Sequence, residues 1–316
     1  MKYLTYKNKD QMPMLGLGTW KSQPGEVYEA VKTAIEVGYC HIDCAPIYGN
    51  EAEIGEALNE VISSGIVSRE ELWITSKLWN GDHEPHEVKP ALEKTLKDLQ
   101  IEYLDLFLMH WPVALKKGSK IPLEPENFFS LEEVPISATW KAMETLVDDS
   151  LVKHIGVSNF SASKIEKLLE TARIKPEMNQ VESHPYLQQK ELKSFCDEHG
   201  IFMTAYSPLG SGDRAPLLKS ENEPQLFENQ EIIKIADAKG VTPAQVLISW
   251  AINRGTVVIP KSTNPVRIQQ NLESKDIELS AEEMQTIEGL ELGFRFLSGD
   301  IWVGEGSPHT LESLWG

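Results

Sequence analysis

The chain has 316 residues, of which 41% are hydrophobic and 25% are charged, so it is long enough to bury a large core. Its formal net charge of −18 argues against a nucleic-acid partner, because binding a phosphate backbone needs a basic face. An acidic surface favours solubility, and any anionic ligand would have to bind at a local cluster of cations.

Three cysteines, Cys40, Cys44 and Cys196, are too few and too odd in number for a disulfide framework, which predicts a reducing, cytoplasmic location. The first ten residues contain no apolar signal-peptide core, and no run of about 18 apolar residues occurs. We therefore expect no membrane association.

Short apolar runs typical of buried strands alternate along the chain with segments of helical periodicity. Strands are predicted at residues 15–19, 39–43, 72–76, 104–109, 154–158, 178–182, 202–207 and 256–260. Helices are predicted around 27–35, 54–62, 86–99, 137–149, 161–171, 187–199, 229–239, 243–253, 265–272 and 280–290. For the helix around 54–62, Asn50 is the predicted N-cap, and Glu53 follows three residues later. Eight strands, each followed by a helix, predict a (β/α)8 TIM barrel, forming one domain over residues 1–316.

Four segments lie outside this alternation. YLTYKNKDQMPML, residues 3–15, predicts a β-hairpin that closes the lower end of the barrel. The connections 112–136 and 208–229 are too long for simple turns and follow the carboxyl ends of strands, where such barrels have their catalytic face. The tail, 291–316, is rich in glycine and aromatic residues and would form a further cover over that face.

The stretch YCHIDCAPIY, residues 39–48, allows two interpretations. Cysteine, histidine and aspartate together are typical of a metal site, whereas Asp43 and Tyr48 suit a proton-transfer site. The strand period of two separates Cys40 and Cys44 from His41 and Asp43, which disfavours the metal site. The cysteines are then expected to pack between the strand and the helices, with His41 inside the barrel.

Polar residues gather where the predicted strands end, and in a parallel barrel these ends meet on one face. A lysine and a histidine after apolar strands cost too much to bury without a purpose, although any one of them could be a simple ion pair at the rim. These residues are Asp43, Lys77, His110, Ser158, Asn159, Gln180, Tyr206, Ser207 and Lys261.

Two further patterns indicate a ligand on this face. GLGT at 16–19 is not a dinucleotide fingerprint of the G-x-G-x-x-G type, because Lys21 stands where the third glycine would be. KSTNPVR at 261–267 instead supplies two cations at a helix N-terminus, which suits an anion. Trp20, Trp79 and Trp111 lie near strand ends and are expected to wall an apolar pocket that excludes water.

In this order and spacing, the motifs resemble those of the aldo-keto reductases over nearly the whole chain. The stretches that carry the resemblance are GLGTW (16–20), GYCHIDCAPIYGNE (38–51), LWITSKLW (72–79), YLDLFLMHWP (103–112), IGVSNF (155–160), QVESHPY (180–186), AYSPLG (205–210) and IPKSTNPVRIQQN (259–271). The resemblance implies a reductase of aldehydes and some ketones, including open-chain sugars, that takes its hydride from a nicotinamide and needs no metal.

The resemblance also implies catalytic roles for four residues. Tyr48 would be the general acid, with its pKa lowered by Lys77, which Asp43 would hold in place. His110 would orient the substrate carbonyl and form an oxyanion pocket with Tyr48. The implied substrate-binding residues are Trp20, Tyr48, Trp79, His110, Trp111, Phe128, Phe294 and Trp302.

The implied cofactor is NADP(H), preferred over NAD(H). Its 2′-phosphate would be bound by Lys261, Ser262, Asn264 and Arg267, and its adenine by Gln270 and Asn271. Its carboxamide would be bound by Ser158, Asn159 and Gln180, and its nicotinamide ring would stack on Tyr206. Its pyrophosphate would be lined by Ser207, Leu209, Ser211 and Asp213, with Asp213 part of a strap across it. Thr19, Trp20, Asp43 and Thr263 complete the implied set of cofactor contacts.

A non-catalytic NADP(H)-binding barrel with a regulatory or structural role is the alternative, as occurs among relatives of this family. The intact set of four residues argues against it, because a pure binding protein need not keep a poised acid. The expected partner is a small carbonyl substrate, with no nucleic acid or membrane, and the expected assembly is a monomer or weak dimer. A steroid double-bond reductase is disfavoured, because those relatives carry glutamate where this chain has His110.

Overall fold

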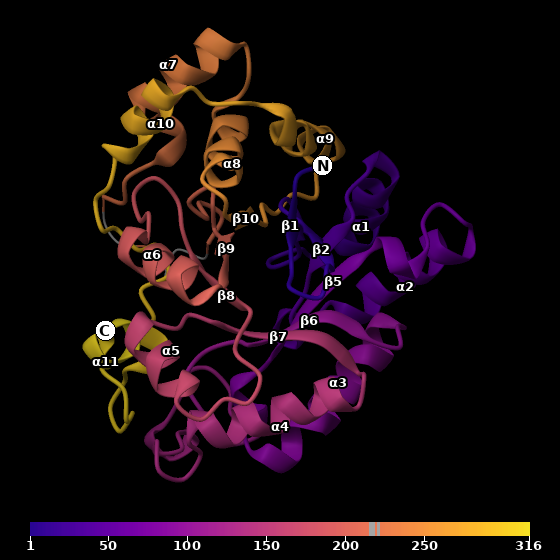
Figure 1. Cartoon of the computed structure of the whole chain (residues 1–316), viewed down its shortest axis with the longest axis vertical. Helices are drawn as coiled ribbons and strands as arrows, with labels where there is room; N and C mark the ends of the chain where they lie inside the picture. Colours follow the sequence, from indigo (N-terminus) through magenta and orange to yellow (C-terminus); the bar gives the residue numbers. More distant parts are fainter. Residues whose placement is uncertain (215–218, 220–221) are drawn as a thin grey trace.

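The computed structural model describes residues 1–214, 219 and 222–316 (Figure 1). Eight parallel strands lie side by side in chain order: β3 (Leu17–Gly18), β4 (His41–Asp43), β5 (Trp73–Leu78), β6 (Leu104–Met109), β7 (Val152–Ser158), β8 (Met178–Glu182), β9 (Phe202–Tyr206) and β10 (Val257–Val258). Parallel bridges from Leu15 to Val258 and from Gly18 to Lys261 join the first strand to the last. The predicted (β/α)8 barrel is confirmed.

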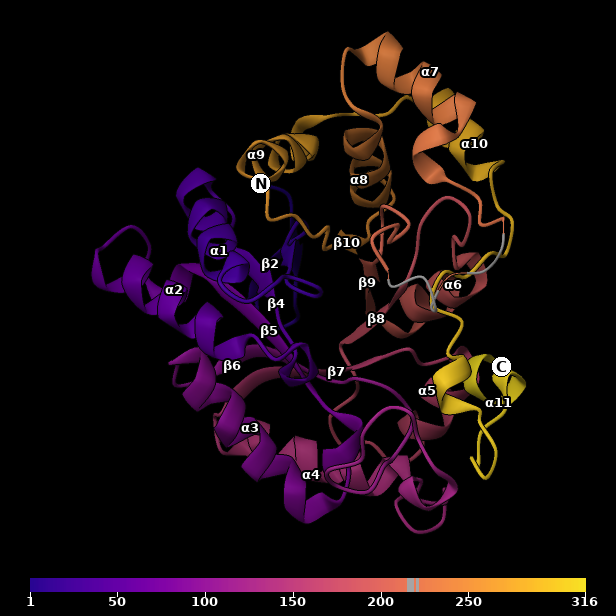
Figure 2. The same cartoon turned by 180° about the vertical axis from the view of Figure 1, so that it is seen from behind.

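The helices form an outer layer around the strands (Figures 1 and 2). They are α1 (Glu26–Val37), α2 (Glu51–Ser63), α3 (Pro85–Leu99), α4 (Ile136–Asp148), α5 (Ala162–Leu169), α6 (Lys190–His199), α7 (Gln230–Lys239), α8 (Pro243–Asn253), α9 (Pro265–Glu273), α10 (Ala281–Glu288) and α11 (Leu311–Trp315). Each of the first ten corresponds to a predicted helix, but β9 is followed by two helices, so the alternation is not one to one. None of the described helices is both long and apolar enough to cross a membrane.

The start of α2 differs from its prediction. Asn50 occupies the N-cap position without a side-chain capping bond, and it donates instead to the Thr19 carbonyl at 2.9 Å. Glu53 accepts a hydrogen bond from the backbone N–H of Gly25 at 2.9 Å. The expectation of a side-chain cap is wrong because both polar groups tie α2 to the loop after β3, which places the neighbouring loops of the barrel face.

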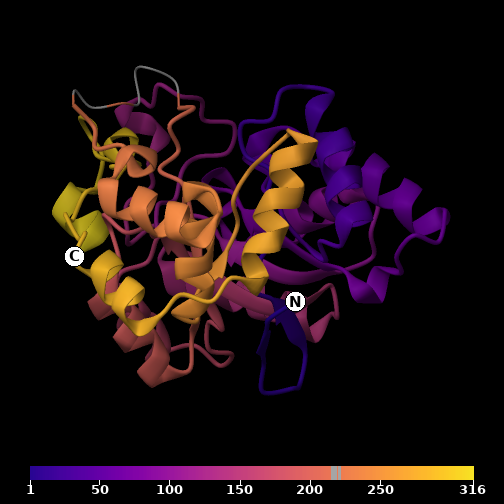
Figure 3. The ribbon, with the colours of Figure 1, turned by 90° about the horizontal axis from the view of Figure 1, so that it is seen from above.

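The N-terminal hairpin consists of β1 (Tyr3–Thr5) and β2 (Gln11–Pro13), paired antiparallel. Tyr6 and Met12 pack with barrel residues from four strands, namely Trp73, Leu106, Leu108, Met178 and Val257. Figure 3, which is turned by 90° from Figure 1, shows the hairpin at one end of the barrel, here called the lower end. The predicted closure of that end is confirmed.

The segments that cover the opposite end are irregular. Connection 112–136 contains a single 3-10 turn, Pro125–Asn127, and the tail contains a 3-10 turn, Asp300–Trp302, before α11, which the sequence did not predict. Connection 208–229 lies partly outside the described residues, and its described part ends in a 3-10 turn, Leu226–Glu228.

His154 in β7 links the hairpin to the barrel through two carboxylates. Its Nδ1 lies 2.7 Å from Glu177 Oε2 and its Nε2 lies 2.9 Å from Asp10 Oδ2, while its ring centroid is 4.1 Å from that of Tyr6. Only an imidazolium can donate from both nitrogens. Burial alone would lower the pKa of His154, but the hydrogen bonds to Glu177 and Asp10 outweigh burial and raise it above its ordinary value.

We predict that His154→Gln destabilises the protein more in acid than in alkali. Because the pKa of folded His154 is raised, its contribution is fully present below the unfolded pKa of about 6.5 and is lost as the pH rises through the folded value. After allowance for solvent screening at the partly exposed carboxylates, we expect a loss of about 1 kcal/mol at pH 6. Urea denaturation at pH 6 and pH 8.5 measures the free energy of unfolding of the variant and of the unsubstituted protein.

His86→Gln serves as the control, because that side chain is 71% exposed. A destabilisation by His154→Gln that is the same at both pH values would show that the charge on His154 does not hold the hairpin.

Candidate active site

A cavity of about 1370 Å³ opens at the carboxyl ends of the strands. The predicted residues that line it are Thr19, Trp20, Asp43, Tyr48, Trp79, His110, Trp111, Ser158, Asn159, Gln180, Tyr206, Ser207, Leu209, Ser211, Asp213, Lys261, Ser262, Thr263, Asn264, Arg267, Gln270, Asn271 and Trp302. They come from most of the strand ends and from the covering loops, as expected where parallel strands end on one face.

Asp43 and Tyr48, which line the cavity, meet Lys77 at its wall. Asp43 ends β4, Tyr48 ends the 3-10 turn Pro46–Tyr48, and Lys77 lies in β5. The Lys77 Nζ atom lies 2.5 Å from Asp43 Oδ1, 3.0 Å from the Cys44 carbonyl and 3.4 Å from the Tyr48 hydroxyl. Burial opposes the charge on Lys77, but the neighbouring groups together, with Asp43 the foremost of them, outweigh burial and raise the pKa of Lys77, so this side chain is a cation.

The pKa of Tyr48 is set by two opposed effects. Burial raises it, and the nearby Lys77 ammonium lowers it, with burial the larger effect. The expectation that Lys77 brings the pKa below its ordinary value is therefore wrong for the net shift, although the direction of the Lys77 effect is as expected. Tyr48 keeps its proton at neutral pH, with a cation beside the oxygen that would lose it.

His110 follows β6 and faces the same cavity. Its ring lies edge-on to that of Tyr48, with 6.1 Å between the centroids. Burial and the charge of Lys77 hold the pKa of His110 well below its ordinary value, so the imidazole is neutral. A neutral imidazole carries one N–H donor and one acceptor nitrogen, so His110 can donate a hydrogen bond without adding a second positive charge beside Lys77.

The residues expected at the carboxamide form a hydrogen-bonded network with the catalytic candidates. Gln180 donates to Asp43 Oδ2 at 2.7 Å, and the Tyr206 hydroxyl donates to Asn159 Oδ1 at 2.7 Å. Asn159 in turn donates to the His110 carbonyl at 2.9 Å, and Ser158 donates to the Gln180 carbonyl at 2.7 Å. This network fixes Asp43 and the backbone of His110 relative to the polar side of the cavity.

The other end of the cavity lies at the N-terminus of α9. Asn264 caps that helix by accepting the Arg267 N–H at 3.1 Å, and Ser262 Oγ accepts the Asn264 N–H at 3.1 Å. Lys261 and Arg267 both line the cavity here. A helix N-terminus flanked by two cations is a favourable site for an anionic group.

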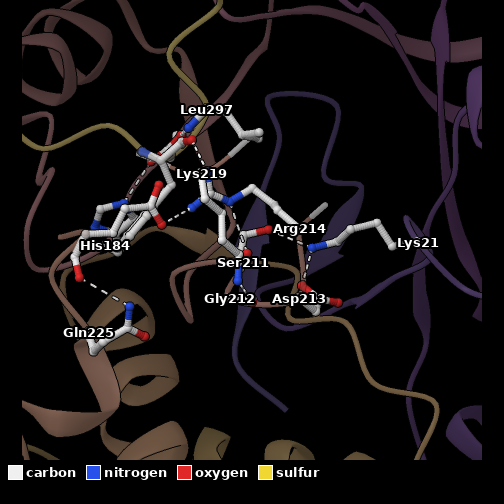
Figure 4. Close-up of polar contacts among 12 residues, drawn as sticks. Lys21, His184, Ser211, Gly212, Asp213, Arg214, Lys219, Gln225 and Leu297 are labelled. Carbon is white, nitrogen blue, oxygen red and sulfur yellow. Dashed lines mark hydrogen bonds and ion pairs between the residues drawn. The ribbon is translucent and has the colours of Figure 1, made fainter. Parts of the chain in front are cut away.

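Lys21, Ser211 and Asp213, which line the cavity, join the loops that follow β3 and β9 (Figure 4), and we call these contacts the strap. Lys21 Nζ forms an ion pair with Asp213 and donates to Ser211 Oγ at 2.7 Å. Arg214 pairs with Glu223 at 2.6 Å and donates to the Phe296 carbonyl. Lys21 was not among the predicted site residues, and its only signal in the sequence was its place directly after GLGTW.

Two predicted substrate-binding residues lie away from the cavity in the described structure. Phe128 is buried in an apolar cluster with Trp111 and Trp302, and Phe294 packs against Phe296 with 5.1 Å between the ring centroids. The tail residues that do line the cavity are Phe296, Leu297, Ser298, Gly299, Asp300, Ile301 and Trp302. Of these only Trp302 was predicted.

Glu182, at the end of β8, holds this part of the tail. Its carboxylate accepts the N–H groups of Phe296 at 2.6 Å and Leu297 at 2.8 Å. Glu182 belongs to the QVESHPY motif, but nothing in the local pattern shows which distant segment it binds.

The cysteine-rich stretch around β4 is divided as the strand period predicts. Cys44 is fully buried among the apolar residues of the main core, and Cys40 is half-buried. Burial lowers the pKa of His41 to about 4, so this inward-facing imidazole is neutral. Among the described residues, no three histidine, cysteine, aspartate or glutamate side chains gather as metal ligands would.

Comparison with known proteins agrees with the fold and with this arrangement. The aldo/keto reductase family model matches residues 14–291. The chain is 52% identical over 315 residues to the aldo/keto reductase slr0942 of Synechocystis sp., covering 100% of this chain and 96% of that protein. It is 49% identical over 295 residues to the aldo-keto reductase family 1 member A1 of Mus musculus, covering 93% of this chain and 90% of that protein.

A solved structure titled aldose reductase from Schistosoma japonicum superposes with a TM-score of 0.85 at 41% identity, covering 95% of this chain and 97% of that one. The fold and the matches together define a barrel oxidoreductase that uses a nicotinamide cofactor. The chain belongs to the aldo/keto reductase family.

We predict that Lys21→Met accelerates release of the bound nicotinamide cofactor. The ion pair with Asp213 and the bond to Ser211 hold the strap closed, and since the Asp213 side chain is 55% exposed we expect an increase in the dissociation rate of about threefold. Stopped-flow fluorescence measures it. Lys32→Met, which removes a surface ion pair with Glu60, should leave the rate unchanged, and equal effects of the two substitutions would refute the role of the strap.

Proposed function

We propose that this protein reduces aldehydes and some ketones, including open-chain sugars, to alcohols with NADPH, and that Tyr48 is the general acid. The observation that supports this best is the position of Lys77, whose Nζ lies 2.5 Å from Asp43 and 3.4 Å from the Tyr48 hydroxyl, below a cavity that His110 also faces. The names of the relatives, aldo-keto reductase and aldose reductase, support the reduction of a carbonyl group.

When bound, the nicotinamide supplies the hydride. The Tyr48 hydroxyl donates its proton to the carbonyl oxygen of the substrate, and the Lys77 ammonium stabilises the phenolate that remains. Because Lys77 is buried and Tyr48 half-buried, this attraction is stronger than it would be in solution. Asp43 keeps Lys77 charged and in place.

His110 positions the carbonyl beside Tyr48. Its neutral imidazole donates a hydrogen bond to the oxygen on which negative charge develops, and this is most effective when the donor is fixed beforehand. Trp20, Trp79, Trp111 and Trp302 are expected to keep water from the reacting atoms.

The residues at the cofactor end of the cavity fit an anionic dinucleotide. In a chain of net charge −18, the cavity is nonetheless lined by Lys21, Lys219, Lys261 and Arg267. The last two flank the N-terminus of α9, where a 2′-phosphate would receive both the charges and the backbone N–H groups. This supports a preference for NADPH over NADH.

Loss of NADPH absorbance on addition of a carbonyl compound to the purified protein tests the activity. Aromatic aldehydes, aldoses and keto acids with both cofactors define the substrate range by kcat/KM. A protein that binds NADPH tightly but oxidises it with none of these compounds would be the non-catalytic barrel instead. We further propose that the protein is one domain over residues 1–316, lies in the cytoplasm and is a monomer or weak dimer.

We predict that Tyr48→Phe lowers kcat by a factor of about 100 to 10,000, the usual contribution of a general acid, because no other group delivers the proton to the carbonyl oxygen. The NADPH Kd, measured by tryptophan fluorescence, should change less than about twofold, since only one hydroxyl is removed. Tyr28→Phe, which removes a surface hydroxyl bonded to Glu60, is the control. Full activity of Tyr48→Phe would exclude this residue as the acid.

We predict that the double substitution Lys261→Met with Arg267→Met raises the NADPH Kd by a factor of at least about 30, from the loss of two charge-assisted contacts, and the NADH Kd by about twofold. Isothermal titration calorimetry measures both constants. Lys275→Met, beyond the far end of α9, should change neither. A parallel loss of affinity for the two cofactors would contradict the assignment of these residues to the 2′-phosphate.

A further inference from the structure

The tail forms one wall of the cavity, and α11 lies directly behind that wall. Leu314 is fully buried in the cluster that contains Trp111 and Trp302, and Trp315 Nε1 donates to the Ser298 carbonyl at 2.7 Å. A side chain added at Gly299 would meet Leu314 Cδ2 at 2.6 Å, so backbone and helix are in close contact. The position of α11 therefore sets the position of residues 298–302.

A continuous row of rings leads from α11 to the catalytic candidates. The ring centroids of Trp315 and Trp111 are 5.6 Å apart, those of Trp111 and Trp302 are 5.4 Å apart, and those of Trp302 and Trp79 are 5.9 Å apart. Trp79 in turn lies 5.4 Å from His110. A displacement of α11 would therefore move first the rings of Trp111 and Trp302, which line the cavity where the substrate is to bind.

With only five residues, α11 is too short to be stable as an isolated helix and depends on its neighbours. The neighbour is α5, which lies beside it in both views (Figures 1 and 2). Lys164 on α5 donates from Nζ to the carbonyls of Ser313 at 2.6 Å and Leu314 at 3.0 Å. These carbonyls are at the end of α11, where helical backbone acceptors lack partners within the helix.

The contacts of Lys164 are directed at main-chain oxygens of the tail. Its side chain is half-buried, and within the described residues it forms no ion pair with an aspartate or glutamate side chain. Its remaining contacts are to Ser161 Oγ and to the main-chain oxygen of Gly316, both at 3.4 Å. Ser163 on the same helix donates to Gly316 at 2.8 Å. Lysine ammonium groups are favourable partners for the carbonyls that end a helix.

We propose that Lys164 is a positioning residue for the substrate: by holding the end of α11, it fixes the wall that contains Trp111, Gly299 and Trp302. This inference rests on the proposed carbonyl reduction. The wall contacts the substrate in the ground state and in the transition state alike, so its displacement raises KM and leaves kcat unchanged. The cofactor end of the cavity, at α9, belongs to other elements and is unaffected.

The test compares Lys164→Met with Lys164→Arg, which keeps the positive charge and the donors. Lys167→Met is the matched control, because Lys167 is exposed on the same helix three residues later. With an aromatic aldehyde, Lys164→Met should raise KM about tenfold, as expected for loss of hydrogen bonds from a charged group. Lys164→Arg should restore most of the affinity, and Lys167→Met should change nothing.

A rise in KM accompanied by similar changes in kcat and in the NADPH Kd would indicate general damage to the fold and would overturn the proposal. So would an unchanged KM in Lys164→Met, or an equal rise in Lys167→Met.

Hydrogen–deuterium exchange of the full chain tests the anchor without relying on activity. In Lys164→Met, the amides of residues 297–315 should exchange about tenfold faster, with the barrel strands unaltered, because local opening follows the loss of local contacts. Unchanged exchange in the tail overturns the anchor. A wild-type chain that reduces no carbonyl would refute the proposed function, while the exchange result would still support or overturn the role of Lys164 in holding the wall.

Discussion

The buried ion pair between Lys77 and Asp43 is the constraint on which the upper end of the barrel depends. Both side chains are almost completely buried, at 1% and 2% exposed, and removing either would leave an uncompensated charge in the interior. All three protons of the ammonium are used, on Asp43, Cys44 and Tyr48, and the second oxygen of Asp43 is occupied by Gln180. One pair therefore ties β4, β5 and β8 to the loop that carries Tyr48, so that the geometry of the candidate site and the packing of the strands cannot vary independently.

The same shelter from water has opposite effects on neighbouring groups. It raises the pKa of Tyr48 and lowers that of His110, so both side chains are neutral and both can donate a hydrogen bond into the cavity. Of these three side chains, Lys77 alone is charged, and the Asp43 carboxylate beside it balances that charge. A site with two neutral donors over one fixed cation suits a reaction in which negative charge appears on an oxygen and is then neutralised by a proton.

The barrel and most of the candidate site follow from local sequence patterns, because strand ends in a parallel barrel converge whatever the loops do. Asp43, His110, Ser158 and Gln180 could thus be placed on one face from their positions in or after apolar runs. The tail could not be predicted in this way: Glu182 binds backbone groups more than a hundred residues away, and Phe296 lines the cavity where Phe294 was expected. The hydrogen bond of Asn50 could not be predicted from local sequence either, since its side chain bonds to a distant loop rather than to its own helix. The net pKa shift of Tyr48 also escaped prediction, because the degree of burial cannot be read from the spacing of residues.

The two ends of the barrel are closed by segments outside the strand–helix repeat, and they differ in what they hold. At the lower end, the hairpin packs apolar side chains against the barrel interior and is joined to it by His154 between two carboxylates. At the upper end, the tail reaches His110 through the row of aromatic rings and is secured by Glu182 and Lys164. These anchors share no atom with the Lys77–Asp43 pair. The wall that contacts the substrate can therefore change by substitution in the tail or on α5 while the buried ion pair, and the chemistry that depends on it, stays the same.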